Sequence, residues 1–386
     1  MSDAELLQAA AALAPQIRSQ ADAIEAARRV PAPIIEELSR AGLLRMTVPR
    51  ALGGAEASPE TMVRAIETIA RADASAGWCV MVHATSALAS AWLDDDAARE
   101  IFGDPHAIAC GVFAPTGKAV DEGDHYRVSG RWAFASGVEE SAWRMLGAVV
   151  TEPSGEPVLS PSGEPLIRHL FLRADETRVV ETWTASGLCG TGSHDLTAGH
   201  VLVPKRRSAS LLAERPRHPG ALYRFPLFGL LSLGIAAVAL GIARESIAAL
   251  SALATEKRPA YSKRSLAQRE MTQAHVAEAE ALVRSSRALL FEAVRETGEA
   301  VAARGAPSAE ERAILRLAAT QAARASARAV DLMYNAGGGS SVYASSPLQR
   351  CFRDVHVVTQ HVMVAEPTYA VVGRVLLGLS SEVGML

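Results

Sequence analysis

Histidines are the side chains best suited to acid–base chemistry near neutral pH, and this sequence has ten of them, including His361 and His83. An unperturbed imidazole has a pKa of about 6.5, so it can take a proton from a substrate or donate a hydrogen bond to one. A single histidine is more often structural, and residue type leaves that alternative open. Residue type alone does not choose among the ten histidines, and His361 and His83 are the candidate catalytic residues because of the segments in which they lie.

Trp132 and Ser136 lie four residues apart in a stretch that is typical of a β-strand. Alternate side chains share one face of a strand, so this spacing places both on the same face if the strand has no bulge. That face would offer an aromatic wall and a hydroxyl group, whereas the structural alternative is a core tryptophan and a turn serine. Thr116, in a Pro-Thr-Gly turn, offers a second hydroxyl donor or is a plain turn residue.

Arg264 and a glycine-rich run have the chemistry of a phosphate site. A guanidinium binds phosphate through a fork of hydrogen bonds, and glycine lets the backbone approach a ligand closely. The alternative is a solvated arginine and a flexible loop between helices. The run contains Gly338, Gly339 and Ser340.

Several other kinds of site are not supported. Residues 111–119 resemble a P-loop but have one residue too many and end in alanine, which cannot bind magnesium. The glycines of residues 187–192 do not form a dinucleotide-binding motif, and no serine hydrolase elbow is present. His356 and His361 are five residues apart, which does not suit two metal ligands on one helix face. We expect no metal site.

The composition is that of an ordinary globular protein. The 386 residues are 49% hydrophobic and 21% charged with a net charge of -3, which gives no electrostatic reason to bind nucleic acid or an anionic membrane. Four scattered cysteines and an acidic N-terminus without an apolar run favour a cytoplasmic protein with reduced thiols. Residues 227–243 are apolar enough for a short membrane span, but their glycine and alanine content favours a buried central helix.

The hydrophobic pattern changes twice along the chain. Residues 4–29, 33–42, 59–71 and 75–91 are predicted helices, of which the first has apolar residues on one face. From about residue 107 to 203, six short β-rich runs alternate with Gly, Pro, Asp and Ser, which predicts an antiparallel sheet or small barrel. Long alanine-rich helices follow and predict a block of four long helices.

The order of elements predicts an α+β protein of three domains. They are an N-terminal helical domain of residues 1–106, a middle β domain of residues 107–215 and a C-terminal four-helix bundle of residues 216–386.

Four separated segments resemble the acyl-CoA dehydrogenase superfamily. They are residues 42–49 with the glycine pair 53–54, residues 130–137, residues 187–195 leading to 203–204, and residues 350–354. The resemblance implies this three-domain fold, usually assembled as a homotetramer. It also implies a flavin between the β domain and the bundle, held with help from a neighbouring subunit.

The position of the usual catalytic glutamate points to one branch of this superfamily. The Tyr-Glu-Gly-Thr motif that follows the Arg-Asp pair in most of the dehydrogenases is missing, and Val362 stands at the glutamate position after His361. A valine cannot take the substrate proton. Some dehydrogenases use a glutamate from an earlier helix, so that alternative stays open.

The chain is more similar to flavin monooxygenases of the same fold, the oxygenase components of two-component hydroxylases. The shared features are residues 71–75, Trp78, His83, residues 114–118, residues 132–136 and residues 349–361. The resemblance implies hydroxylation of an aromatic or indolic small molecule by reduced flavin and O2 through a C4a-hydroperoxyflavin. A separate NAD(P)H:flavin reductase would supply FADH2 or FMNH2. An acyl-CoA dehydrogenase and an N-oxygenase of an amine or amino sugar are the alternatives.

The resemblance also implies roles for the candidate residues. Ser136 would bind the flavin N5 and Trp132 would form a wall of the flavin site, while Thr116 would donate to the isoalloxazine edge. His361 would act as a base or would orient the oxidant, and His83 would contact the substrate or the peroxide group. The flavin phosphate would be bound by Arg264, Gly338, Gly339 and Ser340.

Overall fold

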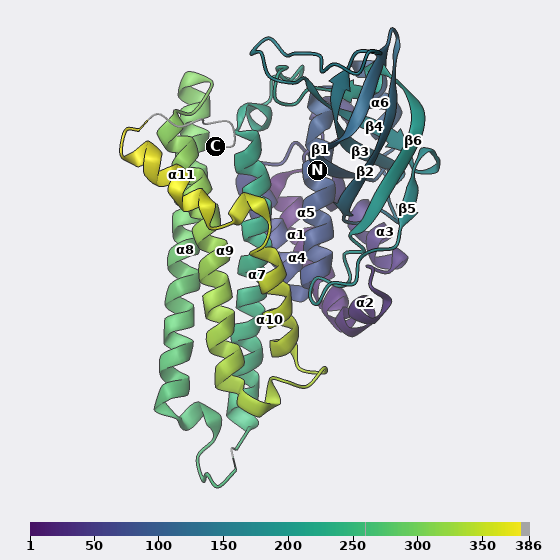
Figure 1. Cartoon of the computed structure of the whole chain (residues 1–386). Coiled ribbons are helices and arrows are strands. Elements are labelled where there is room, and N and C mark those ends of the chain that lie inside the picture. Colours follow the sequence, from purple (N-terminus) through teal and green to yellow (C-terminus); the bar gives the residue numbers. More distant parts are fainter. Residues whose placement is uncertain (259, 380–386) are drawn as a thin grey trace.

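The computed structural model describes residues 1–258 and 260–379, and its helices and strands follow the order α, β, α expected from the sequence (Figure 1). The sheet lies beside the N-terminal helices at one side of the molecule, and the long C-terminal helices lie at the other. The α+β class and the α, β, α order of elements in the prediction are therefore confirmed.

Six helices form the N-terminal part: α1 Asp3–Ser19, α2 Ala21–Ala27, α3 Ala32–Arg40, α4 Pro59–Ala72, α5 Ala74–Ala87 and α6 Asp95–Phe102. Ser2 starts α1 with a capping box: the Ser2 hydroxyl accepts from the Glu5 amide, and the Glu5 carboxylate accepts from the Ser2 amide. The single helix expected over residues 4–29 is wrong. The chain breaks at Gln20, although Ile17 and Ile24 still reach the same core.

Seven strands form one mixed sheet in the order β5-β6-β2-β1-β3-β4-β7. The strands are β1 Ala109–Glu122, β2 His125–Ala135, β3 Trp143–Thr151, β4 Ile167–Arg173, β5 Arg178–Val180, β6 His194–Pro204 and β7 Ser208–Ala209. An entirely antiparallel sheet was the wrong expectation, because β3 pairs with β1 in parallel. The hairpin of β1 and β2 occupies one edge of β1, so the returning chain adds β3 at its other edge.

The C-terminal part contains α7 Leu227–Glu256, α8 Glu270–Arg304, α9 Ala309–Gly337, α10 Pro347–Val358 and α11 Pro367–Leu376. The prediction of four long helices is wrong in one respect. In the described part of the chain α7, α8 and α9 are long, and the 12-residue α10 packs against α7 and α9 as the shorter fourth member. The proline at the start of α10 and the turn at Thr359 limit its length.

Helix α7 is the central helix of the molecule. It is long and apolar enough to cross a membrane by composition, but 83% of its most apolar window is buried within this chain. Its neighbours are α4, α5, α9 and α10, so it joins the N-terminal helices to the bundle. The apolar stretch at residues 227–243 is thus used as a core helix between two helical layers, as the sequence indicated.

Candidate active site

The four motif segments converge on helix α5. The Thr47 hydroxyl of the first segment donates to the carbonyl of Ala84 on α5. From the third segment, the amide of Gly190 donates to Ser75 Oγ at 3.1 Å, near the start of α5. The fourth segment joins the third, because Asp354 Oδ1 accepts from the amide of Leu188 at 2.6 Å. Distant parts of the sequence therefore surround one helix.

A chain of hydrogen-bonded hydroxyl groups lies where α5 meets the ends of β2 and β6. The indole nitrogen of Trp78 donates to Ser136 Oγ at 3.0 Å, and Ser136 Oγ lies 2.6 Å from Ser193 Oγ. Ser193 Oγ is also 2.6 Å from Thr191 Oγ1, which donates to the carbonyl of Leu188 at 2.9 Å. Ser136, Thr191 and Ser193 are all buried.

The direction of the protons is assigned from the two ends of the chain, the Trp78 indole as donor and the Leu188 carbonyl as acceptor. Thr191 has one hydroxyl proton and gives it to the Leu188 carbonyl, so Thr191 must accept from Ser193. Ser193 has then used its proton and must accept from Ser136. Ser136 accepts from Trp78 on its other side. The proton of Ser136 is committed to this chain, and its remaining lone pair can only accept a further hydrogen bond.

His361 lies across Trp78 from Ser136. Its ring centroid is 5.8 Å from that of Trp78, in an edge-to-face arrangement. The histidine stands just before the 3₁₀ turn η9 Val362–Val364 and caps it, since its Nδ1 accepts from the amide of Met363 at 3.2 Å. Arg316 on α9 holds the same turn by donating to the carbonyl of Met363 at 3.0 Å. Two structural elements therefore fix the position of the imidazole.

The surroundings of His361 favour its neutral form. Burial lowers the pKa of His361 from 6.5 to about 4, and the positive charge of Arg316 acts in the same direction. Because Nδ1 accepts from a backbone amide, the proton of the neutral ring is on Nε2. Among the described residues, Nε2 has no hydrogen-bond partner. At neutral pH His361 is thus a hydrogen-bond donor through Nε2, and the alternative role of base is disfavoured.

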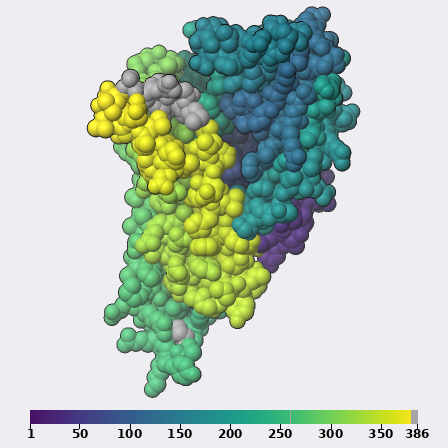
Figure 2. Space-filling model, viewed as in Figure 1, coloured from purple at the N-terminus to yellow at the C-terminus, as the bar shows by residue number. Residues whose placement is uncertain are grey.

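The space-filling view shows a hollow between the C-terminal segment, which carries His361, and the β domain, which carries Ser136 (Figure 2). Trp78 contacts both residues, through a hydrogen bond to Ser136 and an edge-to-face contact with His361.

His83 is on α5 but is closed off from the recess. Its ring is fully buried, and its Nδ1 hydrogen donates to the carbonyl of Ala109 at 3.1 Å. Its Nε2 is buried without a partner and lies against Gly137, where an added Cβ would be 2.6 Å away. Burial lowers the pKa of His83 to about 4. The expected contact with substrate is therefore corrected to a supporting role beneath the turn that carries Ser136.

Trp132 and Ser136 do not share a face of the sheet. The register of β2 with β6 shifts between Trp132 and Ala135, and Ser136 follows the strand in a turn. Trp132 is fully buried, packs over Gly117 and donates to the carbonyl of Gly147 at 2.7 Å. The assumption of a regular strand was wrong, and Trp132 is a core residue of the β domain.

The aromatic side chain that faces outward is Phe134. Its φ of 63° is unusual for a bulky residue, and this conformation in the bulge leaves its ring 71% exposed. The ring lies edge-on to Trp183 with centroids 6.3 Å apart. Strained residues with exposed aromatic rings are typical of ligand sites. Phe134 was missed because the period of a regular strand places it on the same face as Trp132, whereas the irregular backbone after Trp132 turns its ring outward.

Thr116 is exposed near the irregular middle of β1, but its hydroxyl already donates to the carbonyl of Arg131 at 3.0 Å. It is therefore not free to donate to a ligand as expected, and it can only accept.

The connection that contains Arg264 and the glycine-rich run lie at the same end of the bundle. Arg264 is in the connection between α7 and α8, and Lys257 at the start of this connection donates to the carbonyl of Gly337 at 2.7 Å. Gly338 has a φ of 55° that favours glycine, and open space surrounds Gly338 and Gly339. Gly338–Ser340 form a 3₁₀ turn, η8.

This end of the bundle is far from Ser136 and His361 within one chain. Arg316 contacts the His361 turn near the start of α9, whereas Gly337 is the last residue of the same helix. At a rise of 1.5 Å per residue, the two positions are about 30 Å apart. Within one polypeptide, the structure therefore does not bring the expected phosphate-binding residues near the hydrogen-bonded hydroxyl groups of Ser136, Ser193 and Thr191.

Trp78 and Ser193 also belong to the site, although no local sequence pattern indicated their hydrogen bonds to Ser136. Trp78 precedes His83 by five residues in an apolar helix, and Ser193 is one of several small polar residues after Gly187. Each partner of Ser136 is more than 50 residues away in the chain. Among the described residues no cluster of three or more His, Cys, Asp or Glu side chains could hold a metal ion.

Comparison with known proteins agrees with this architecture. Residues 3–94 match the model of the acyl-CoA dehydrogenase N-terminal domain, and residues 233–366 match that of the acyl-CoA dehydrogenase C-terminal domain. The indole-3-acetate monooxygenase of Pseudomonas putida is 32% identical over 361 residues, which span 93% of this chain and 90% of that protein. The resemblance inferred from the four motif segments is confirmed.

Two further relatives carry related names. The oxygenase component of a FADH(2)-dependent resorcinol hydroxylase from Rhizobium is 29% identical over 391 residues, covering 96% of this chain and 94% of that protein. The crystal structure of the HsaA monooxygenase from Mycobacterium tuberculosis superposes with a TM-score of 0.91 at 25% identity, with full coverage of both chains.

Proposed function

Because the chain belongs to the acyl-CoA dehydrogenase family, in its branch of flavin-dependent monooxygenases, we propose that it hydroxylates an aromatic or indolic small molecule. It is the oxygenase component of a two-component system, uses reduced flavin and O2, and receives the flavin from a separate reductase. The observation that carries this function is the buried Ser136 hydroxyl held by Trp78 and Ser193, with a neutral His361 against the same tryptophan.

The residues present fit a reduced flavin. Reduced flavin has a hydrogen on N5, and the one free lone pair of Ser136 suits a donor of this kind. The exposed Phe134 ring offers an apolar surface for the isoalloxazine, and the open backbone at Gly338 and Gly339 offers a cradle for phosphate. When bound, the reduced flavin supplies the activation of O2.

The protein side chains position and protect the reacting groups. Ser136 is held by Trp78 and Ser193, so it accepts without rotating its hydroxyl proton toward the ligand. His361 presents Nε2–H as a donor to the oxygen atom of the oxidant or the substrate, and its low pKa keeps it neutral at pH 7. The buried surroundings of Trp78 exclude water from this side of the recess.

The separation of about 30 Å along α9 supports an assembly of several copies. We propose that Arg264, Gly338, Gly339 and Ser340 bind the phosphate of a flavin held by Ser136 and Phe134 of a neighbouring subunit in a homotetramer. A cytoplasmic location is part of the same proposal, since the reductase draws on NAD(P)H and the four cysteines of this chain are buried free thiols.

The test supplies the protein with reduced FAD or FMN and oxygen, and measures hydroxylated product and hydrogen peroxide for a panel that includes indole-3-acetate and resorcinol. We expect product from at least one phenol or indole. His361→Leu should keep flavin oxidation but convert most product into peroxide, whereas His361→Gln, which retains an N–H donor, should retain part of the product. Failure to hydroxylate any member of the panel, with reduction of bound flavin by an acyl-CoA, would refute the proposal in favour of a dehydrogenase.

A further inference from the structure

A cationic pocket lies on the helical side of the molecule, between α1, α4, α7 and α8. Its volume is about 470 Å³, in the range of small-molecule sites. Seven residues line it, and five of them are ionisable: Leu7, Arg64, Glu67, Thr68, Arg71, Arg244 and Arg287. None of these residues belongs to the hydroxyl chain or to the His361 turn, so the pocket is separate from the active site.

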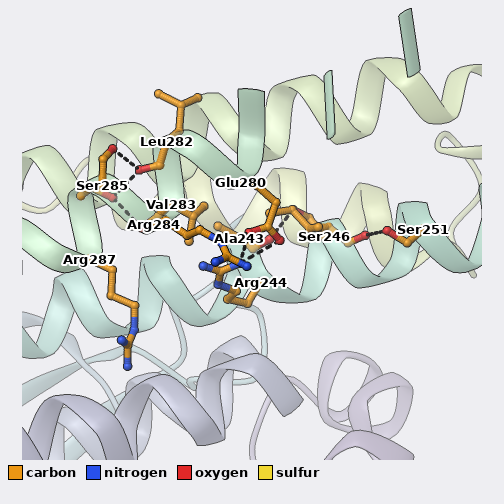
Figure 3. Close-up of polar contacts among 12 residues, drawn as sticks. Ala243, Arg244, Ser246, Ser251, Glu280, Leu282, Val283, Arg284, Ser285 and Arg287 are labelled. Atoms are coloured by element: carbon orange, nitrogen blue, oxygen red, sulfur yellow. Dashed lines mark hydrogen bonds and ion pairs between the residues drawn. The ribbon is translucent and has the colours of Figure 1, made fainter. Parts of the chain in front are cut away.

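Most of its arginines are held by carboxylates. Arg287 donates through Nε to both oxygens of Glu67 at 2.9 Å, which links α8 to α4. Arg244 donates to both oxygens of Glu280 at 3.0 and 2.9 Å. Figure 3 shows Arg244 and Arg284 meeting at Glu280, while Arg287 extends from α8 toward the N-terminal helices. These contacts fix the guanidinium groups in place.

Arg64 and Arg287 are further ordered by an aromatic ring. Both guanidinium carbons lie 4.5 Å from the centroid of Phe291 on α8. Such cation–π contacts hold the cations without neutralising them. Arg64 also bonds Glu60 at 2.9 Å on its own helix.

Arg71 differs from the other arginines of the pocket. Its guanidinium forms no hydrogen bond or ion pair with any residue in the described ranges 1–258 and 260–379. Arg71 is in the last turn of α4 and is the first residue of the 71–75 motif. Only Ser75 and Asp73 of this motif have a role at the active site, where they support α5. Its positive charge is available to a ligand.

The charges around the pocket do not balance. The arginines are Arg64, Arg71, Arg244, Arg284 and Arg287, and the carboxylates that pair with them are Glu60, Glu67 and Glu280. Five positive and three negative charges leave an excess of two positive charges. A phosphate group carries about -1.5 to -2 at neutral pH, and it can accept forked hydrogen bonds from several guanidinium groups.

We propose that this pocket binds a phosphate group of a small molecule, with Arg71 as its free ligand and Arg244 as a preoriented second ligand. The pocket is larger than a phosphate ion alone, so it accommodates a phosphate ester with an organic part against Leu7 and the methylene groups of the arginines. A carboxylate would neutralise only half of the excess charge.

The test is equilibrium dialysis or calorimetry of the full-length protein with inorganic phosphate and with pyrophosphate, at constant ionic strength adjusted with chloride. We expect saturable binding of one phosphate group per chain, because fixed ionic strength removes general screening effects. Arg71→Gln and Arg244→Gln should each weaken binding by about tenfold or more, since each removes a charge-assisted hydrogen bond. Arg40→Gln, which removes an exposed arginine elsewhere, should not change it.

The affinity for reduced flavin should stay unchanged in Arg71→Gln, which separates this pocket from the flavin site. Phosphate that binds equally to all three variants, or heat that never saturates, would overturn the proposal. A change of oligomeric state in Arg71→Gln without phosphate binding to the wild type would also overturn it, because the pocket would then receive acidic side chains of a second copy.

Discussion

Removal of the Ser193 hydroxyl should raise the amount of peroxide released per flavin oxidised, although Ser193 itself does not contact the ligand. Ser193→Ala takes away the acceptor for the Ser136 proton and the donor for Thr191. Ser136 can then turn its proton toward the flavin, where a donor would face the N5 hydrogen. The hydroxyl chain therefore predicts that a change at Ser193 resembles a change at Ser136 in its effect on catalysis.

The magnitude follows from two hydrogen bonds of 2.6 Å in a buried site. A buried polar group left without a partner costs about 1–3 kcal/mol, so the free energy of unfolding should fall by about that amount. The loss of one neutral hydrogen bond to the ligand, about 0.5–1.5 kcal/mol, corresponds to a roughly two- to tenfold rise in peroxide released per flavin oxidised. Ser136→Ala should show the larger effect of the two.

The assay measures product and peroxide together after mixing with reduced flavin and oxygen, and urea unfolding gives the stability. Ser246→Ala is the matched control, because Ser246 is equally buried but donates within helix α7 to the carbonyl of Ala243. Ser246→Ala should leave the ratio of peroxide to product unchanged. If Ser193→Ala also leaves this ratio unchanged while Ser136→Ala raises it, the proton direction assigned to the chain is wrong.

Three further predictions concern residues close to the hydroxyl groups of Ser136 and Ser193. The pKa of His83 is near 6.5 in the unfolded chain and about 4 in the folded protein, so the free energy of unfolding should fall by at most about 3 kcal/mol as the pH drops from about 6.5 to 4. In urea unfolding at several pH values, His83→Gln should show a smaller loss of stability, and an unchanged loss would contradict this. Gly137→Ala should destabilise the protein by about 1–3 kcal/mol, because φ of Gly137 is 65° and the new Cβ would meet His83. Thermal unfolding would detect this loss, and wild-type stability of the variant would argue against it. Phe134→Ala should weaken binding of reduced flavin severalfold and change the stability little, since the Phe134 ring is exposed. Equal affinity of variant and wild type in a fluorescence titration would exclude Phe134 from the flavin site.

The sequence alone determined much of the framework, because helix formation and burial are recorded in local patterns. Ile17 and Ile24 recur on one apolar face, and they are buried even though the helix breaks between them. The apolar composition of α7 already indicated a core helix, and the motif segments identified the family before any contact was known. The candidate Ser136 lies in one of these segments and His361 ends the stretch 349–361 shared with the monooxygenases, and the structure brings both into contact with Trp78.

The tertiary structure decided what these residues can do. A regular strand would place Trp132 and Phe134 on one face, but the bulge near the end of β2 leaves Trp132 buried and Phe134 exposed. One residue of irregular backbone is enough for this because side chains alternate along a strand. The acceptor role of Ser136 depends on Trp78 and Ser193, which come from other elements of the chain. The neutral state of His361 depends on burial and on Arg316. Proton direction and pKa arise from contacts between distant segments, so only the folded chain determines them.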